Sequence, residues 1–367
     1  MPKNHMFTRQ KFLLLLLEWC ISFHPAGSIW VILLVSRGFS LIEIGLVEGI
    51  FHVVSLCCEL PSGVVADVLG RRRSLAASCA MFTLSALLMA CSGGIGGVCL
   101  AMAVNAMGYN LMSGAREAMT YESLLQMGQE GEYLKFSSLQ NSVYRFSDGG
   151  AMLPAGATLL LGWRLAYVLD AGVSLLGLLT VLMLWEPEGE RGREILSRRK
   201  VWESVKSTVT GAWNLLRSDR TVAVIMLLNA LVGACATLTR FFLQERVEAA
   251  VTMPALLGPA LFVLGLGGGL AGLLTGPLDR LNYGKAVALT GMGVALCVLL
   301  ARGGTLPVFM GVGLLCGLLD DALQLVSDKR LNDRFPSEQR ATLVSLASLS
   351  FSLVMIPLSP LFGTLFS

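Results

Sequence analysis

Apolar stretches of about 20 residues recur along the chain, and they constrain its fold more than any other feature of the sequence. An α-helix rises about 1.5 Å per residue, so each stretch is long enough to cross about 30 Å of hydrocarbon. A transmembrane barrel strand would instead show about ten residues of alternating polarity. The pattern therefore predicts membrane-spanning helices, at 12–35, 41–68, 74–92, 95–122, 137–161, 163–185, 221–245, 254–278, 286–301, 305–328 and 341–365.

Composition agrees with this prediction. The 367 residues are 54% apolar and only 14% charged, with a mean hydropathy of +0.68. Soluble domains carry about 25% charged residues, so soluble enzymes, secreted disulfide scaffolds and disordered chains are excluded. The net charge of +3 is too small to indicate a nucleic-acid partner, and the lipid bilayer is the expected surrounding.

Cysteine and histidine usage indicates no metal or cofactor chemistry. The nine cysteines fall in apolar runs without a CxxC pair, so we expect buried free thiols that pack as small apolar groups. Three histidines provide no ligand set for zinc or haem. The glycines at 265–269 follow no strand, which argues against a phosphate loop, and no catalytic constellation is visible. We expect no cofactor, no metal site and no enzymatic activity.

The basic residues predict the orientation. With the N-terminus in the cytoplasm, 22 of the 28 Lys and Arg residues lie in cytoplasmic segments and four lie outside. We expect a multi-pass protein of the cytoplasmic (inner) membrane, with the C-terminus outside if there are eleven helices. The first run could be a cleaved signal peptide, but Glu18 interrupts it and the run resumes at 29–35, which favours a retained helix.

An internal repeat divides the chain. Asp279 and Gly284 follow Asp67 and Gly70 by 212 and 214 residues, in similar surroundings. Parallel repeats of six helices are one transporter architecture. We expect a bundle of six helices at 1–185, a cytoplasmic central loop at 186–220 and a bundle of five helices at 221–367, the repeat placing a missing twelfth helix near 376–398. The loop could be an amphipathic interfacial helix or a disordered tether.

Several motifs then resemble one family, the major facilitator superfamily. The string from Gly63 to Arg72, G-x-x-x-D-x-x-G-R-R, resembles its motif A, and residues 59–63 resemble the E-x-P-x-G lead-in. Residues 113–124 and the Arg-Ala-Thr at 340–342 resemble further segments of the same group. The resemblance implies an all-α polytopic fold of two six-helix bundles and secondary transport by alternating access. The fifth span lacks the motif C typical of drug–proton antiporters.

Motif A also suggests a gate. Gly63 and Gly70 permit close helix approach and a tight turn. Asp67 would face the positive end of the helix that begins near Arg340. By resemblance, this contact closes the outward-open state, and Arg71 or Arg72 pairs with Glu117 or Glu122. The alternative is that these charges only fix topology.

Polar residues at membrane depth are the candidates for substrate binding or proton coupling, because each charge there costs about 2.5–3.5 kcal/mol on insertion scales. Asn105, Tyr109 and Asn229 could instead be interhelical hydrogen bonds. Arg240 and Glu59 could instead extend to the interface. The candidates are Glu18, Glu48, His52, Glu59, Asn105, Tyr109, Arg116, Arg145, Asp148, Asn229, Arg240, Asp320 and Asp321.

These features predict a monomeric secondary active transporter that moves a small solute by alternating access, in proton-coupled efflux. The coupling ion would be a proton or sodium. Glu18, or Asp148 paired with Arg145 three residues away, would carry the proton. The alternative is a truncated, transport-inactive membrane protein or an interaction remnant.

Overall fold

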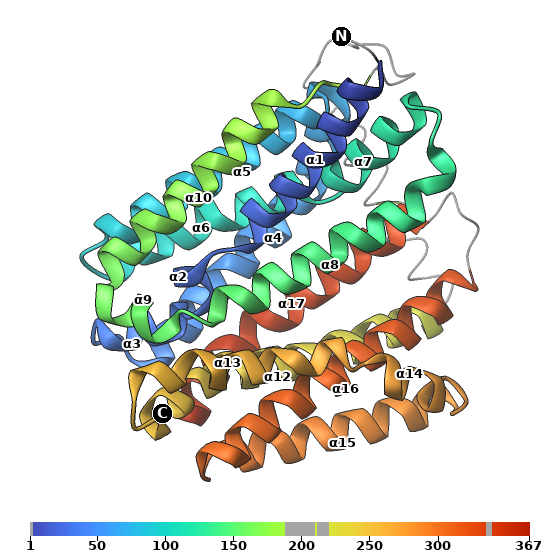
Figure 1. Cartoon of the computed structure of the whole chain (residues 1–367). Helices are drawn as coiled ribbons and strands as arrows, with labels where there is room; N and C mark the ends of the chain where they lie inside the picture. Colours follow the sequence, from blue (N-terminus) through green and yellow to red (C-terminus); the bar gives the residue numbers. More distant parts are fainter. Residues whose placement is uncertain (1–2, 188–209, 211–219, 335–339) are drawn as a thin grey trace. The chain divides into compact units, whose positions relative to one another are not determined.

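The computed structural model describes residues 3–187, 210, 220–334 and 340–367 (Figure 1), and side chains there except at 3–5, 60, 63–69, 332 and 340–344. Every regular element in these ranges is helical. The first half contains α1 (Lys3–Ser22), α2 (Pro25–Ser28), α3 (Trp30–Ser36), α4 (Leu41–Leu69), α5 (Arg71–Cys91), α6 (Ile95–Met112), α7 (Ala115–Gln126), η1 (Glu130–Glu132), α8 (Tyr133–Met152), α9 (Ala155–Leu161) and α10 (Trp163–Met183). The second half contains α12 (Arg220–Ala250), α13 (Pro254–Gly269), α14 (Gly272–Asp279), α15 (Tyr283–Ala301), α16 (Leu306–Asn332) and α17 (Arg340–Phe366).

Within the described residues, nine helical segments are long and apolar enough to cross a membrane. They coincide with nine of the eleven spans that the sequence predicts. The other two predicted spans, 12–35 and 137–161, consist of the interrupted helices α1–α3 and α8–α9. The helix predicted in the central loop lies outside the described residues.

Three of the breaks have local causes. Gly114, with a φ of 72°, separates α6 from α7 inside the fourth predicted span. Pro154 lies between α8 and α9, and because proline has no backbone N–H, it cannot donate a helical hydrogen bond there. Pro25 begins α2 after the break at Phe23–His24. Hydropathy alone does not reveal these interruptions, because the residues around them remain apolar.

The described residues form two compact units that differ from the two halves of the sequence. Of the described residues, unit 1 contains 3–28, 57–151 and 161–187, and unit 2 contains 29–56, 152–160, 210, 220–334 and 340–367. Helix α4 therefore contributes residues 41–56 to unit 2 and residues 57–69 to unit 1. The predicted division at residues 185 and 221 stays a prediction about which segments move together.

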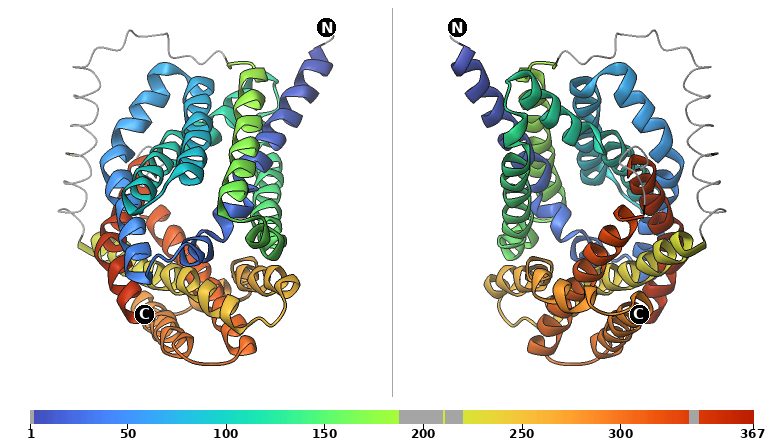
Figure 2. Two further views of the ribbon diagram at one scale, coloured as in Figure 1. Left: turned by 90° about the vertical axis from the view of Figure 1, so that its left-hand side faces the viewer. Right: turned by 90° about the vertical axis from the view of Figure 1, so that its right-hand side faces the viewer.

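In unit 1, α5 packs between α6 and α10, and α1 packs against α10 (Figures 1 and 2). Leu17, Leu75, Met119 and Val181 meet in its core with at most 2% of each side chain exposed. In unit 2, α16 packs against α12, α13 and α15, and α12 also packs against α17. These helices hold the polar side chains described next.

Candidate functional site

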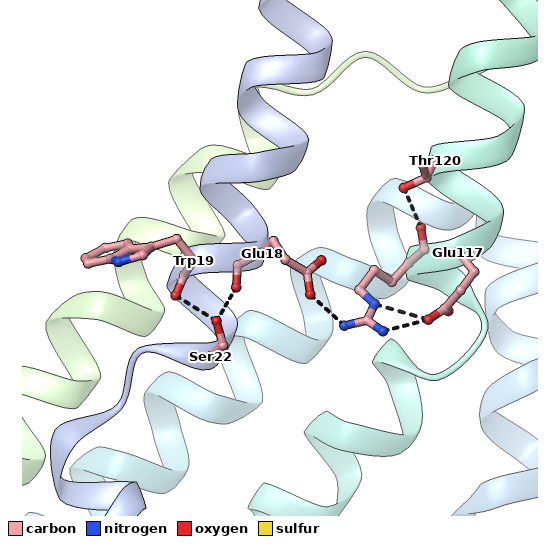
Figure 3. Close-up of polar contacts among 6 residues, drawn as sticks. Glu18, Trp19, Ser22, Glu117 and Thr120 are labelled. Carbon is pink, nitrogen blue, oxygen red and sulfur yellow. Dashed lines mark hydrogen bonds and ion pairs between the residues drawn. The ribbon is translucent and has the colours of Figure 1, made fainter. Parts of the chain in front are cut away.

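Unit 1 contains a charged cluster of three residues from two helices. Arg116 Nη1 donates to Glu18 Oε1 at 2.8 Å, and Arg116 Nη2 donates to Glu117 Oε1 at 2.7 Å. Glu18 comes from α1 and the other two from α7 (Figure 3). Arg116 thus bridges two carboxylates that lie 98 and one residue away in sequence.

Local structure places both sides of this cluster. The break at Ser113–Gly114 puts Arg116 in the first turn of α7, and its side chain reaches Glu18 on α1. Side-chain hydroxyls add bonds to the same two backbones: Ser22 Oγ donates to Glu18 O at 2.6 Å, and Thr120 Oγ1 donates to Arg116 O at 3.1 Å. These bonds keep the carbonyls at both positions satisfied.

The three side chains of the cluster differ in their exposure. The side chain of Glu18 is 3% exposed, that of Arg116 is 33% exposed and that of Glu117 is 51% exposed. The ring of Tyr144 lies 6.0 Å from the Arg116 guanidinium carbon, at the outer limit of a cation–π contact.

Unit 2 contains a second network, built from amides and hydroxyls. Asn229 Nδ2 on α12 donates to Gln324 Oε1 on α16 at 2.5 Å, and Ser327 Oγ lies 3.0 Å from Asn229 Oδ1. Tyr283 OH lies 3.0 Å from Ser327 Oγ, and Gln324 Nε2 donates to Asp328 Oδ1 at 2.9 Å. The network joins three helices of this unit.

Arg240, Asp320 and Asp321 lie half-buried on α12 and α16 of unit 2. A β-carbon on Gly317 would lie 3.1 Å from Arg240 Nη1, and one on Gly233 would lie 3.0 Å from Asp320 Oδ1. The two glycines therefore leave the space that these charged side chains occupy.

The motif A region is partly described. Gly70 has a φ of 93°, and a β-carbon there would lie 2.8 Å from Glu186 Oε1, so no other residue fits without strain. Arg71 Nε lies 3.4 Å from Glu122 Oε1. Arg72 donates to the carbonyls of Val181 and Leu182 at the end of α10. Gly63 and Asp67 lie on α4 and Arg340 begins α17, but their side chains lie outside the described residues.

The remaining candidates are spread over several helices. Glu48 and His52 are buried and in contact in unit 2. Glu59 and Asn105 are half-buried, while Tyr109 is 54% exposed with its ring against Phe82. On α8, Arg145 is exposed and Asp148 is half-buried. The substrate and coupling roles of these residues stay predictions.

Sequence reasoning missed two polar side chains in unit 1, the buried Asp170 and the half-buried His24. Asp170, 3% exposed on α10, accepts the backbone N–H groups of Ala26 at 3.2 Å and Gly27 at 2.8 Å. His24 Nε2 lies 2.9 Å from Ser174 Oγ. The signal was available for Asp170, because an acid in the middle of an apolar span is the criterion that identified Glu18.

No group of three or more His, Cys, Asp or Glu side chains in the described part of the chain is placed to hold a metal ion.

The family model of the Major Facilitator Superfamily matches residues 12–280, most of the chain. The chain therefore belongs to this family of membrane transporters, and its fold is that of a secondary transporter rather than of an enzyme. The sequence matches no curated protein.

Solved transporter structures share the fold. A mutant form of the nucleoside transporter NupG has a TM-score of 0.78 at 15% identity, covering 98% of this chain and 91% of that one. A D-xylose–proton symporter has a TM-score of 0.62 at 14% identity, with coverages of 97% and 88%. The peptide transporter POT has a TM-score of 0.61 at 14% identity, with coverages of 97% and 91%. At these identities the likeness establishes the fold, and the solutes belong to those proteins.

Proposed function

We propose that this chain is a proton-coupled secondary transporter that exports a small polar solute across the cytoplasmic membrane. The observation that carries the proposal is the Glu18–Arg116–Glu117 cluster, a buried carboxylate that shares one guanidinium with a more open one. Sodium is the alternative coupling ion. The protein would work as a monomer with its N-terminus in the cytoplasm.

The cluster supports coupling through its charge. With both carboxylates ionised it carries two negative charges and one positive charge. The ionised Glu18 carboxylate can accept a hydrogen bond from a polar group of the solute, and protonation of Glu18 removes that acceptor. Proton binding and solute binding at Glu18 then exclude each other, which links the two equilibria in the sense that proton-driven export requires. Asp148 with Arg145 on α8 is the alternative proton carrier.

Alternating access would move the bundles at 1–185 and 221–367 against each other, with motif A residues Asp67 and Arg340 closing one state. Residues 29–56 and 152–160, which pack in unit 2, belong to the first of these bundles. In such a cycle they would exchange their partners in the second half of the chain.

Reconstituted liposomes test this function. Vesicles are loaded with a labelled nucleoside, D-xylose or a dipeptide, and solute movement is followed under an imposed pH gradient or an imposed sodium gradient. We expect movement of a solute against its gradient with the pH gradient and none with sodium. Inside-out vesicles report the direction, with export appearing as accumulation.

The matched pair of variants is Glu18→Gln and Glu130→Gln, since Glu130 is an exposed carboxylate on η1. We expect Glu18→Gln to lose gradient-driven movement at least tenfold while solute exchange without a gradient continues. Glu130→Gln should behave as the unmodified protein. Gradient-driven transport that survives both Glu18→Gln and Asp148→Asn would remove the coupling assignment.

A further inference from the structure

A second buried ionisable cluster lies in unit 2, whereas Glu18 belongs to unit 1. His52 Nε2 on α4 lies 3.3 Å from Glu48 Oε1, and His52 Nδ1 lies 3.3 Å from Ser352 Oγ on α17. Glu48, His52 and Ser352 are 7%, 6% and 4% exposed. The imidazole is thus the bridge between a carboxylate on its own helix and a hydroxyl on the neighbouring one.

The helices cross closely beside this cluster. A β-carbon on Gly45 of α4 would lie 2.9 Å from the Pro360 α-carbon on α17, so only glycine permits the crossing. Gly49 faces Ile356 at ordinary contact distance. The two ring nitrogens of His52 have Glu48 and Ser352 as their partners in this contact.

Few other charges face His52. From residue 341 to residue 366, α17 contains no acidic or basic side chain. The ring of Phe351 packs edge-on against the His52 ring, with centroids 5.6 Å apart, and also lies against Gly233 beside Asp320. Asp320 on α16 and Arg240 on α12 are therefore the charged groups beyond that ring. Glu48 is the acid in direct contact.

We propose that Glu48 and His52 form a second proton-binding site, which binds one proton when α4 packs against α17 and so makes this contact pH-sensitive. The site is separate from the coupling carboxylate Glu18. Its part in the transport cycle rests on the function proposed above, but proton binding by the contact does not.

Charge balance gives the proton count. One proton shared between the Glu48 carboxylate and His52 Nε2 leaves the pair neutral overall, on whichever atom it resides. A second proton, or none, would leave a net charge between two apolar helices, which costs several kcal/mol by the general penalty for an uncompensated buried ion. The packed contact therefore favours the form with one proton.

The direction of the pH effect follows. In water above about pH 6.5, a histidine is neutral and a glutamate is ionised, so an exposed pair holds no proton. Packing α4 against α17 then takes up one proton, and the packing equilibrium constant falls by up to tenfold for each pH unit. Between about pH 4.5 and 6.5 the exposed pair already holds one proton, and the dependence disappears.

Hydrogen–deuterium exchange of the purified protein in detergent tests the site without any solute. Protection factors, corrected for the intrinsic exchange rate, are measured for residues 41–56 and 345–366 from pH 5.5 to 8.5. We expect protection in both segments to fall several-fold per pH unit above about pH 6.5, while α5 of unit 1 keeps its protection. A flat profile in 41–56 and 345–366 overturns the proposal.

Glu48→Gln leaves only a neutral imidazole, so packing takes up no proton above about pH 6.5 and the pH dependence there should disappear. His52→Gln leaves the buried acid, which still takes up one proton on packing, so its slope should persist and extend below about pH 6.5. Ser350→Ala is the matched control, since Ser350 on α17 bonds the carbonyl of Leu346 and not His52. It should keep the slope of the unmodified protein. A slope that survives in Glu48→Gln above about pH 6.5, one that stops at about pH 6.5 in His52→Gln, or one that is lost in Ser350→Ala also overturns the proposal. Because the readout needs no transport, an inactive protein that retains the slope refutes the transport function and leaves the proton site standing.

Discussion

The charged cluster of unit 1 and the amide network of unit 2 occupy corresponding places in the internal repeat. The repeat offset of about 213 residues places Glu18 two positions from Asn229, and Arg116 one position from Asp328. Each pair of helices is joined by polar side chains, α1 to α7 by Glu18–Arg116 and α12 to α16 by Asn229–Gln324. One copy uses an ion pair and the other uses neutral amides.

The difference shows how two similar helix pairs can respond differently to protonation. An ion pair in an apolar bundle depends on both partners, because a lone buried charge is costly, and it changes when a proton binds. An amide pair has no proton to gain near neutral pH, and interhelical hydrogen bonds contribute modestly in membranes. We therefore expect proton sensitivity at the ion pair of unit 1 and proton-independent packing or solute recognition at the Asn229–Gln324 contact of unit 2.

The largest expected effect follows from removing the cation. Arg116→Gln leaves Glu18 buried without its guanidinium, so we expect a loss of about 3–5 kcal/mol in the free energy of unfolding at pH 8. Denaturant unfolding in detergent measures it. The double variant Glu18→Gln with Arg116→Gln should recover most of the loss, because no uncompensated charge remains. Failure of the double variant to recover stability would mean that Arg116 acts through packing.

The same variant should respond to pH in a defined direction. In folded Arg116→Gln, Glu18 is a buried carboxylate without a cation, and protonation removes this uncompensated charge from the folded state. Stability should therefore rise as the pH falls from 8 to 5, the reverse of a partnered carboxylate. Unfolding midpoints across this range measure the effect, and Asn229→Ala is the comparison that should lack it. If the two variants had equal pH profiles, the ion pair of unit 1 would be no more sensitive to protons than the amide pair of unit 2.

A smaller effect is expected in unit 2. Asn229→Ala removes bonds to Gln324 and Ser327, and transmembrane hydrogen bonds of this kind contribute about 0.6 kcal/mol on average and about 1.7 kcal/mol at most. Unfolding in detergent should show a loss in that range at any pH from 5 to 8. A loss above about 3 kcal/mol in the free energy of unfolding would mean that the amide network stabilises the fold as much as the ion pair does.

The smallest effect belongs to a surface pair of unit 1. Lys11 Nζ bonds Glu132 Oε2 at 2.8 Å, and this bond and its charge hold the pKa of Glu132 below its usual value. The stabilisation is present above the pKa of Glu in the unfolded chain and is lost as pH falls through the lower pKa of the folded state. In Lys11→Ala, the Glu132 carboxyl should titrate at higher pH by carbon NMR, with no measurable change in unfolding. An unchanged titration would show that the pair does not persist in solution.

The sequence predicts the fold because run length and hydropathy determine which segments can enter a bilayer. Nine predicted spans agree with helices that the structure describes, and motif A identifies the family. The breaks at His24 and Gly114 were not predicted. They depend on the backbone conformation of one residue or on a distant partner such as Asp170, and a hydropathy window contains neither.

The candidate site was only half predictable for a similar reason. Glu18 and Arg116 stand out individually as charges in apolar runs, but they lie 98 residues apart, and nothing in the sequence indicates that they pair. Helical spacing correctly predicts that Glu48 and His52 share a face. It does not predict Ser352, which lies 300 residues from His52, as a contact of the imidazole. Local periodicity identifies faces, and only tertiary structure identifies partners.

Asp170 fastens the start of α2 to α10 at the place where the first span is broken, next to Ser28, where the chain leaves unit 1 for unit 2. The segment that carries Glu18 is consequently anchored at its far end to a different helix. Residues 29–36 can then change their orientation at this point while Glu18 keeps its contact with the Arg116 guanidinium. The first span therefore consists of separate helical segments, and two contacts hold the break between them to α10: Asp170 with the start of α2, and Ser174 with His24.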